Sequence, residues 1–332
     1  MAAEPALDAR VQGAPSCGAL SRVYVSLPLT GPAAAAGRDV LRGAQLALGA
    51  ARGEVPEIVV LDGFAADRDA QALANAHRAV GDDQALAYLG DFHSSQVEAT
   101  ARVTGEAGLL QVAPVASYSE LRGETLVRLM PHDGVGARAI AEWLVRARVR
   151  EVLVVHDYGD QYGEPVGAMC AEAARSRGLK VRIRRVWDHD ERPADDLGDA
   201  EAVLYVGVAG SGAVGLWHDL HAADPRLWLL GSEGVAVPWL ARALEPTAAA
   251  RTRFFVANRG PLAFYGFEAM ALVLDALAAG SDRAAVARLA RSTRDRESIL
   301  GRYSIDAEGH TTTTAYGRLA VVGGELVWDN AM

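Results

Sequence analysis

Cysteine is scarce in this sequence, because the 332 residues contain only Cys17 and Cys170. Two cysteines cannot build a disulfide framework, and neither has further ligand residues at the spacing of a metal site. The sequence therefore excludes a disulfide-rich scaffold, and it predicts no metal site at either cysteine.

Positive charge is in deficit. Lysine and arginine together number 33 against 42 acidic residues, which gives a formal net charge of −9. A chain with this balance has no global positive field to collect phosphates, so we do not expect nucleic acid as a partner.

Long hydrophobic runs are also missing. The longest apolar stretches, such as residues 269–279 with Asp275 inside, fall well short of the roughly 20 residues that span a bilayer. We therefore expect no membrane-spanning segment.

The first residues lack the basic start and apolar run of a signal peptide. They are rich in alanine, proline and glycine and offer no periodic apolar face, so we expect a flexible leader over residues 1–21. Either the protein stays inside the cell, or its signal segment is absent from this sequence. A lipid-modified Cys17 would favour export.

What the sequence does contain is a regular alternation of short apolar runs and longer amphipathic stretches. Such alternation is typical of βα units on parallel sheets, and the chain length favours two domains. The first series has strands at 23–27, 57–61, 85–89 and 110–113 and helices at 40–51, 67–79 and 94–107. After a break at 114–125, a second series has strands at 152–156, 181–186, 202–208 and 227–230 and helices at 135–147, 165–177 and 213–222.

Motifs that would indicate an enzyme are weak or missing. Residues 210–215 form a GxGxxG pattern with Glu233 at the distance of a ribose-binding acid, but a dinucleotide fingerprint belongs on the first strand of its sheet. His218 and His221 lie one helical turn apart without a third metal ligand. No serine lies in a GxSxG motif. We therefore expect no enzymatic activity, no cofactor and no metal.

Residues 90–95 (Gly-Asp-Phe-His-Ser-Ser) are more informative, because hydroxyl residues follow a buried strand and begin a helix. Backbone amides at that helix start, together with Ser94 and Ser95, can form an anion site for a carboxylate. The alternative is a plain helix cap. The next strand also ends in hydroxyl residues, Ser117 and Tyr118, and the carboxyl ends of parallel strands converge on one edge.

A carboxylate occupies a comparable place in the second series. Glu233 lies between Gly231 and Gly234, directly after the apolar strand at 227–230. A lone glutamate in a loop is usually solvated. Placed opposite the anion site, however, it supplies the charge needed to hold an ammonium group.

At these residues the sequence resembles the type I periplasmic solute-binding proteins, especially the leucine/isoleucine/valine-binding branch that serves branched-chain amino acid ABC transporters. The resemblance runs nearly end to end. It is carried by five segments in the family's order, namely 28–44, 90–114, 156–164, 231–235 and 303–309.

The resemblance implies roles for individual residues. Ser94 and Ser117, with backbone groups around Val115 and Ala116, would hold an α-carboxylate. Tyr162 and Glu233 would hold the α-amino group.

Several departures from the family concern the side-chain pocket. Ala36 stands where relatives have an aromatic residue, and Val208 and Ala209 stand where they have tyrosines. The pocket should therefore be roomier, with His93, Phe92 and Tyr118 as lining residues, which favours a ligand bulkier than leucine. The family's cysteine bridge has no counterpart here.

The resemblance implies two doubly wound α/β lobes joined by a three-segment hinge, the Venus-flytrap architecture. Lobe 1 is expected at 22–118 plus 260–312 and lobe 2 at 125–257 plus 316–332, with crossings near 118–125, 258–262 and 311–316. The implied function is that of the extracytoplasmic solute-binding component of an ABC importer, a monomer that binds an amino acid or related carboxylate and is read by a membrane permease.

Two alternatives stay open. One is a cytosolic or membrane-associated small-molecule sensor of the same fold. The other is a dinucleotide-dependent oxidoreductase built on residues 210–215.

Overall fold

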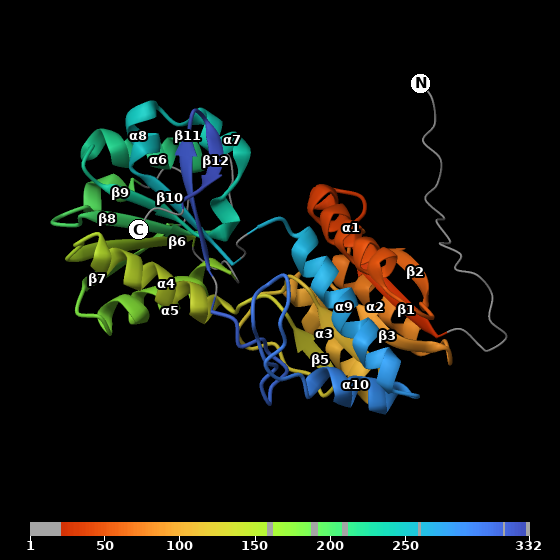
Figure 1. Cartoon of the computed structure of the whole chain (residues 1–332). Coiled ribbons are helices and arrows are strands. Elements are labelled where there is room, and N and C mark those ends of the chain that lie inside the picture. Colours follow the sequence, from red (N-terminus) through yellow and green to blue (C-terminus); the bar gives the residue numbers. More distant parts are fainter. Residues whose placement is uncertain are drawn as a thin grey trace, which may run out of the picture. The chain divides into compact units, whose positions relative to one another are not determined.

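The computed structural model describes residues 21–157, 162–186, 192–207, 212–257, 260–314 and 316–329. These residues form two compact units (Figure 1). Unit 1 comprises the described residues up to Pro131 together with Gly260–Thr313, and unit 2 comprises His132 to Arg259 and the chain from Thr314 onward. The chain therefore passes between the units three times. Apart from Ser21, the leader expected at 1–21 lies outside the described residues.

Unit 1 is built on a five-stranded parallel sheet with the order β2-β1-β3-β4-β5. Its elements are β1 (Arg22–Leu27), α1 (Ala34–Ala50), β2 (Glu57–Asp62), α2 (Arg68–Val80), β3 (Ala85–Leu89), α3 (Ser94–Glu106), β4 (Leu110–Ala113), β5 (Leu126–Arg128), α9 (Ala263–Ala279) and α10 (Arg283–Arg291). The doubly wound fold expected from the alternation is confirmed.

Helices cover both faces of the first sheet. Helices α2 and α3 pack together on one face, while α1 and α9 pack together on the other and α10 adjoins α9 (Figure 1). Local signals fix the helix starts, since Asp67 and Asp282 each accept a hydrogen bond from the backbone N–H three residues on, at 3.0 and 2.9 Å.

Glycine allows α1 and α9 to touch through their backbones. A Cβ atom at Gly43 would overlap the carbonyl oxygen of Ala263, and one at Gly266 would overlap the carbonyl oxygen of Val40. The two helices can approach this closely only because neither position carries a side chain.

Unit 2 is built on a seven-stranded sheet with the order β12-β11-β10-β9-β8-β6-β7. Its elements are α4 (Asp133–Arg146), β6 (Glu151–Asp157), α5 (Gly163–Arg175), β7 (Lys180–Val186), η1 (Pro193–Asp196), β8 (Ala202–Val206), α6 (Ala213–Ala223), β9 (Trp228–Gly231), η2 (Glu233–Val235), α7 (Pro238–Ala243), α8 (Pro246–Ala250), β10 (Thr252–Val256), β11 (Gly317–Val322) and β12 (Glu325–Trp328). Strands β6 to β10 are parallel, whereas β11 and β12 form an antiparallel hairpin.

The hydrophobic core of unit 2 consists of two clusters of buried residues, one on each face of the sheet. On β6, Val152 and Val154 face α4 and α5, while Leu153 and Val155 face α6, α7 and α8. This alternation follows from the two-residue period of a strand. Among the helices of the described residues, none is both long and apolar enough to cross a membrane.

The first crossing lies later in the chain than the sequence predicts. The expected crossing at 118–125 would place β5 in the second lobe, but Leu126 pairs with Gln111 of β4. His310 forms a further bridge to Arg128. Unit 1 therefore extends to Pro131, because residues 126–128 supply the last strand of its sheet.

Candidate functional site

In unit 1, the predicted anion-binding residues lie at the start of α3, just beyond the carboxyl end of β3. The sequence predicts Ser94 as the cap, but His93 holds the N-cap position with extended backbone angles and Ser94 is the first helical residue. The backbone N–H of His93 donates to Gln96 Oε1 at 3.4 Å. His93 is half-buried, and burial, followed by the nearby Arg68 charge, lowers the pKa of its imidazole.

Ser94 joins the helix start to the loop after β4. Its hydroxyl oxygen accepts a hydrogen bond from the backbone N–H of Tyr118 at 3.2 Å. Val115, Ser117 and Tyr118 are half-buried in this loop. The two strand ends that the sequence analysis linked therefore lie together in unit 1.

Two of the predicted residues of unit 1 have contacts of a different kind. Ser95 is exposed, and its hydroxyl donates to Asp69 Oδ1 on α2 at 3.0 Å. The side chain of Ala116 is buried in an apolar cluster with Val97 and Leu121. Tyr118 packs against this apolar cluster, so Ala116 takes part in packing, whereas the Ser95 hydroxyl is directed to α2.

The buried carboxylate of Asp91 also lies at the carboxyl end of β3. It accepts hydrogen bonds from Ser26 (2.7 Å), Tyr88 (2.9 Å) and Thr100 (2.9 Å). Burial raises the pKa of Asp91 to about 6, although these hydroxyl donors oppose the shift. Asp91 is 1% exposed and satisfied by three donors, so we interpret it as a structural residue.

In unit 2, Glu233 begins η2 directly after β9. Its Oε2 accepts a hydrogen bond from the backbone N–H of Ala257, which follows β10, at 3.2 Å. Glu233 is half-buried, and burial raises the pKa of its carboxyl group. Within the described part of the chain, no arginine or lysine forms an ion pair with it. A carboxylate in this setting is suited to accept a cation.

Tyr162 lies beside Glu233, as the resemblance implies. It precedes α5 and is half-buried, and its ring lies near Ser232, whose hydroxyl group contacts the backbone of Gly207. A Cβ atom at Gly234 would lie 3.4 Å from Tyr162 Cε1, so the ring packs against the glycine next to Glu233. Burial raises the pKa of Tyr162, which keeps its hydroxyl group neutral and available as a donor or an acceptor.

Two residues of this group were not predicted from the sequence. Tyr316, at the third crossing, packs against Gly136 of α4, and burial followed by the Glu233 charge raises its pKa. Asp133 is a buried residue in the first turn of α4, and its charge acts on both Tyr162 and Tyr316. We call Asp133, Tyr162, Ser232, Glu233 and Tyr316 the tyrosine–carboxylate cluster. The available signals were the position of Asp133 at a helix start and that of Tyr316 at a crossing.

Other predicted features lie partly outside the described residues. Val208 and Ala209 fall there, as do Gly210 and Ser211 of the glycine-rich segment. The two histidines of α6 contact neighbouring helices, since His218 Nε2 lies 3.3 Å from the Ala243 carbonyl oxygen and His221 Nε2 lies 3.0 Å from Thr247 Oγ1. In the described residues, no group of three histidine, cysteine, aspartate or glutamate side chains is arranged to hold a metal ion.

Comparison with known proteins agrees with this architecture. A family model described as periplasmic binding protein matches residues 22–196. A Leu/Ile/Val-binding protein homolog 3 of Brucella melitensis is 30% identical over 233 residues, which are 64% of this chain and 61% of that protein. An amino acid binding protein of Pseudomonas aeruginosa is 29% identical over 174 residues, 49% of this chain and 45% of its own length. The chain thus spans less than two thirds of either relative.

Solved structures are similar over a longer range. The leucine-binding protein LivK of Thermotoga maritima superposes with a TM-score of 0.76 and 22% sequence identity, covering 93% of this chain and 98% of that one. A putative branched-chain amino acid ABC transporter protein of Rhodospirillum rubrum gives 0.75 and 23%, with 93% and 100% covered. These similarities establish the fold of the whole described chain.

Proposed function

Because the chain belongs to the type I periplasmic binding proteins of the branched-chain amino acid family, we propose that it binds an amino acid as the solute-binding component of an ABC importer. The family is one of solute-binding proteins, not of enzymes. Particular residues of each unit would bind the two charged groups of the amino acid.

The observation that carries the proposal is the environment of Glu233. Among the described residues, this half-buried carboxylate receives one backbone hydrogen bond, from Ala257, and two tyrosine side chains lie within its electrostatic reach. Such a group is stabilised by an incoming cation, and the α-ammonium of an amino acid supplies one. We propose that Glu233 and Tyr162 bind this ammonium and that Tyr316 lies beside it.

The start of α3 supports the carboxylate half of the proposal. Backbone N–H groups at a helix N-terminus favour an anion, and the hydroxyl groups of Ser94 and Ser117 add donors. We propose that these groups, with the backbone at Val115, bind the α-carboxylate of the same ligand. Ser95 and Ala116 are not assigned side-chain roles, because both side chains have other contacts.

For the side chain of the ligand, we propose a group bulkier than that of leucine. Ala36 on α1 is half-buried and small, while the aromatic rings of Phe92 and His93 lie edge to face with centroids 5.1 Å apart. A small side chain at position 36 and aromatic rings at positions 92 and 93 suit a large apolar or aromatic substituent. We also propose an extracytoplasmic monomer whose ligand-bound form contacts a membrane permease.

The test is isothermal titration calorimetry with the twenty L-amino acids and aromatic acids. We expect at least one amino acid to bind, and Glu233→Gln to weaken that binding by about 10- to 100-fold, because a charge-assisted hydrogen bond contributes roughly 1.5–3 kcal/mol.

The matched control is Glu172→Gln, which removes the same charge from an exposed position on α5. It should leave the affinity unchanged. Unaltered binding in Glu233→Gln would remove Glu233 from the site, and no binding of any amino acid would refute the proposed ligand class.

A further inference from the structure

A cavity of unit 2, of about 780 Å³, lies at the opposite edge of the sheet from Glu233. Its wall is formed where β6 to β10 begin, by residues such as Glu151, Lys180, Glu201, Trp228 and Arg251. The seven residues of β6 separate the two edges by about 20 Å. This cavity is therefore distinct from the tyrosine–carboxylate cluster, and a ligand can bind in it whether or not the protein binds an amino acid.

Charged side chains dominate the wall, and most of its carboxylates are already paired. Glu201 accepts from Arg150 Nε at 3.0 Å and Nη2 at 2.6 Å, and Asp224 accepts from Arg226 Nε at 3.0 Å and Nη2 at 2.9 Å. Glu151 accepts from Arg182, outside the cavity, at 2.8 Å. These pairs leave little carboxylate charge for the remaining cations.

Three cations of the wall are not matched in this way. Within the described residues, no ion pair is formed by Arg148, Lys180 or Arg251. The same holds for one carboxylate of the wall, that of Asp199. A surplus of positive charge therefore remains in this cavity, although the whole chain has a net charge of −9. A local surplus of this kind favours an anion.

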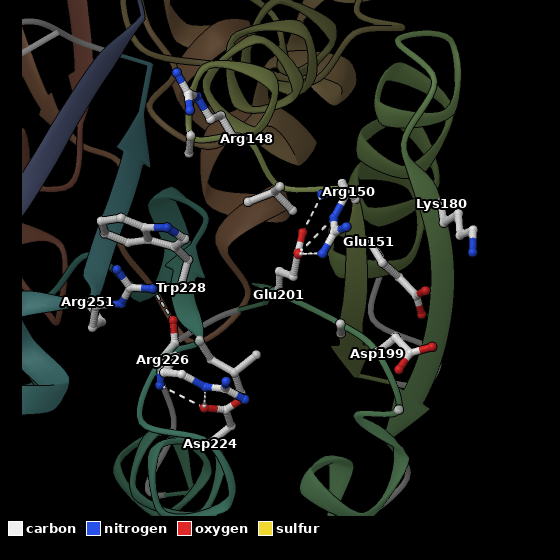
Figure 2. Close-up of a pocket in the computed structure, with 15 residues that line it drawn as sticks. Arg148, Arg150, Glu151, Lys180, Asp199, Glu201, Asp224, Arg226, Trp228 and Arg251 are labelled. Carbon is white, nitrogen blue, oxygen red and sulfur yellow. Dashed lines mark hydrogen bonds and ion pairs between the residues drawn. The ribbon is translucent and has the colours of Figure 1, made fainter.

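Arg251 is the cation whose surroundings are least favourable. Its guanidinium carbon lies 4.0 Å from the centroid of the Trp228 ring, and one terminal nitrogen donates to the Arg226 carbonyl oxygen. Its Nε is buried, and no hydrogen-bond partner for it lies in the described part of the chain. Figure 2 shows Arg251 beside Trp228, with the paired Arg150 and Glu201 on another part of the wall.

A neighbouring guanidinium adds to this imbalance. Arg253 lies 5.3 Å from the same Trp228 ring, and it shares the carboxylate of Asp329 with Arg318, each at 2.8 Å. Burial, and then the Arg253 charge, lower the pKa of Arg251. An anion next to Arg251 would offset both effects.

We propose that this cavity is a second binding site, for a phosphate group. A phosphate carries up to two negative charges and several acceptor oxygens, which suits separate donors such as Arg251 and Arg148 better than a single carboxylate does. The volume is sufficient for an organic phosphate. The phosphate group can belong to a free molecule or to a phospholipid headgroup.

Calorimetry of the full chain with inorganic phosphate and with pyrophosphate, at constant ionic strength, tests the free source. Co-sedimentation with vesicles of phosphatidylglycerol and phosphatidylcholine, against phosphatidylcholine alone, tests the headgroup. We expect binding in at least one arm, and the arm that binds identifies the source. Absence of binding in both arms overturns the proposal.

The variants decide whether the cavity is responsible. Arg251→Gln should weaken the binding at least about tenfold, and Arg148→Gln, at an exposed position, should weaken it less. Arg242→Gln removes the same charge from an exposed position on α7 and should have no effect. Equal losses in all three variants would indicate general charge attraction and overturn the site. If Arg251→Gln does not fold, Arg148→Gln carries the same comparison with Arg242→Gln.

Discussion

Glu233 and Asp91 are both carboxylates at strand ends, but their surroundings give them different properties. Asp91 is buried, and three hydroxyl donors occupy its carboxylate oxygens, although burial still raises its pKa to about 6. Within the part of the chain that the structure describes, Glu233 receives one backbone donor, from Ala257. The difference in hydrogen bonding favours a structural role for Asp91 and a ligand-binding role for Glu233.

The raised pKa of Glu233 predicts how amino acid affinity depends on pH. Only the ionised carboxylate attracts an ammonium group. As pH is lowered, the affinity should therefore begin to decrease before pH reaches about 4.3, the ordinary pKa of a glutamate. Binding in this range should release a proton. Calorimetry in buffers of different ionisation enthalpy measures that release, and Glu233→Gln should lack it. An affinity that stays constant down to pH of about 4.3 would contradict the assignment.

Asp91 predicts a pH dependence of stability. Its folded pKa of about 6 lies above the ordinary value, so the folded protein binds the proton more tightly than the unfolded chain does. The stabilisation linked to that proton is fully present below about pH 4 and is lost as pH rises through about 6. A shift of about two pKa units corresponds to roughly 3 kcal/mol of unfolding free energy.

Asp91→Asn resembles the protonated acid, so it should remove this dependence. Guanidinium unfolding of both proteins at about pH 4 and about pH 7 measures it. We expect the stability of the wild type, relative to the variant, to decrease between the two values. Parallel changes in both proteins would show that Asp91 does not titrate in this range.

The sequence indicates candidate site residues where a local motif marks them and does not indicate those that only the fold brings together. Glu233 follows an apolar strand, and Ser94 follows a buried one, so both are visible as polar residues at strand ends. Asp133 and Glu233 lie far apart in the sequence, and the charges of both act on Tyr316 only because the chain folds. No local pattern distinguishes such residues from ordinary tyrosines and helix-start acids.

At the scale of elements, alternation of apolar and amphipathic segments predicted the two helix-covered sheets well. Short strands were harder to assign. β5 has three residues, and it lies between β4 and the distant His310, whose bridge to Arg128 no pattern near residue 126 indicates. The β11–β12 turn has a clear local signal, because Gly323 and Gly324, both with positive φ, form its two-residue loop.

The contact between α1 and α9 predicts opposite effects for two substitutions in one helix. Gly43→Ala places a methyl group against the Ala263 backbone and should destabilise the protein by about 1–3 kcal/mol. Gly49→Ala faces open space and should stabilise it by up to about 1 kcal/mol. Denaturant unfolding at one pH measures both. Similar effects for the two variants would show that α1 and α9 can separate without cost.

At the scale of the whole molecule, the proposed ligand draws on residues of both units. Ser94 belongs to unit 1 and Glu233 to unit 2, and the chain passes between these units three times. A ligand that binds one unit by its carboxylate and the other by its ammonium makes all its contacts only in one arrangement. Its binding should therefore shift the population towards that arrangement.

Small-angle X-ray scattering with and without the amino acid found by calorimetry tests this shift. We expect a smaller radius of gyration at saturation, because contacts to both ends of the ligand require the units to close around it. Glu233→Gln at the same ligand concentration should show a smaller decrease, since it loses contacts on the side of unit 2. Binding by calorimetry without any change in the radius would mean that one unit holds the ligand by itself, and the two-unit mechanism would then be wrong.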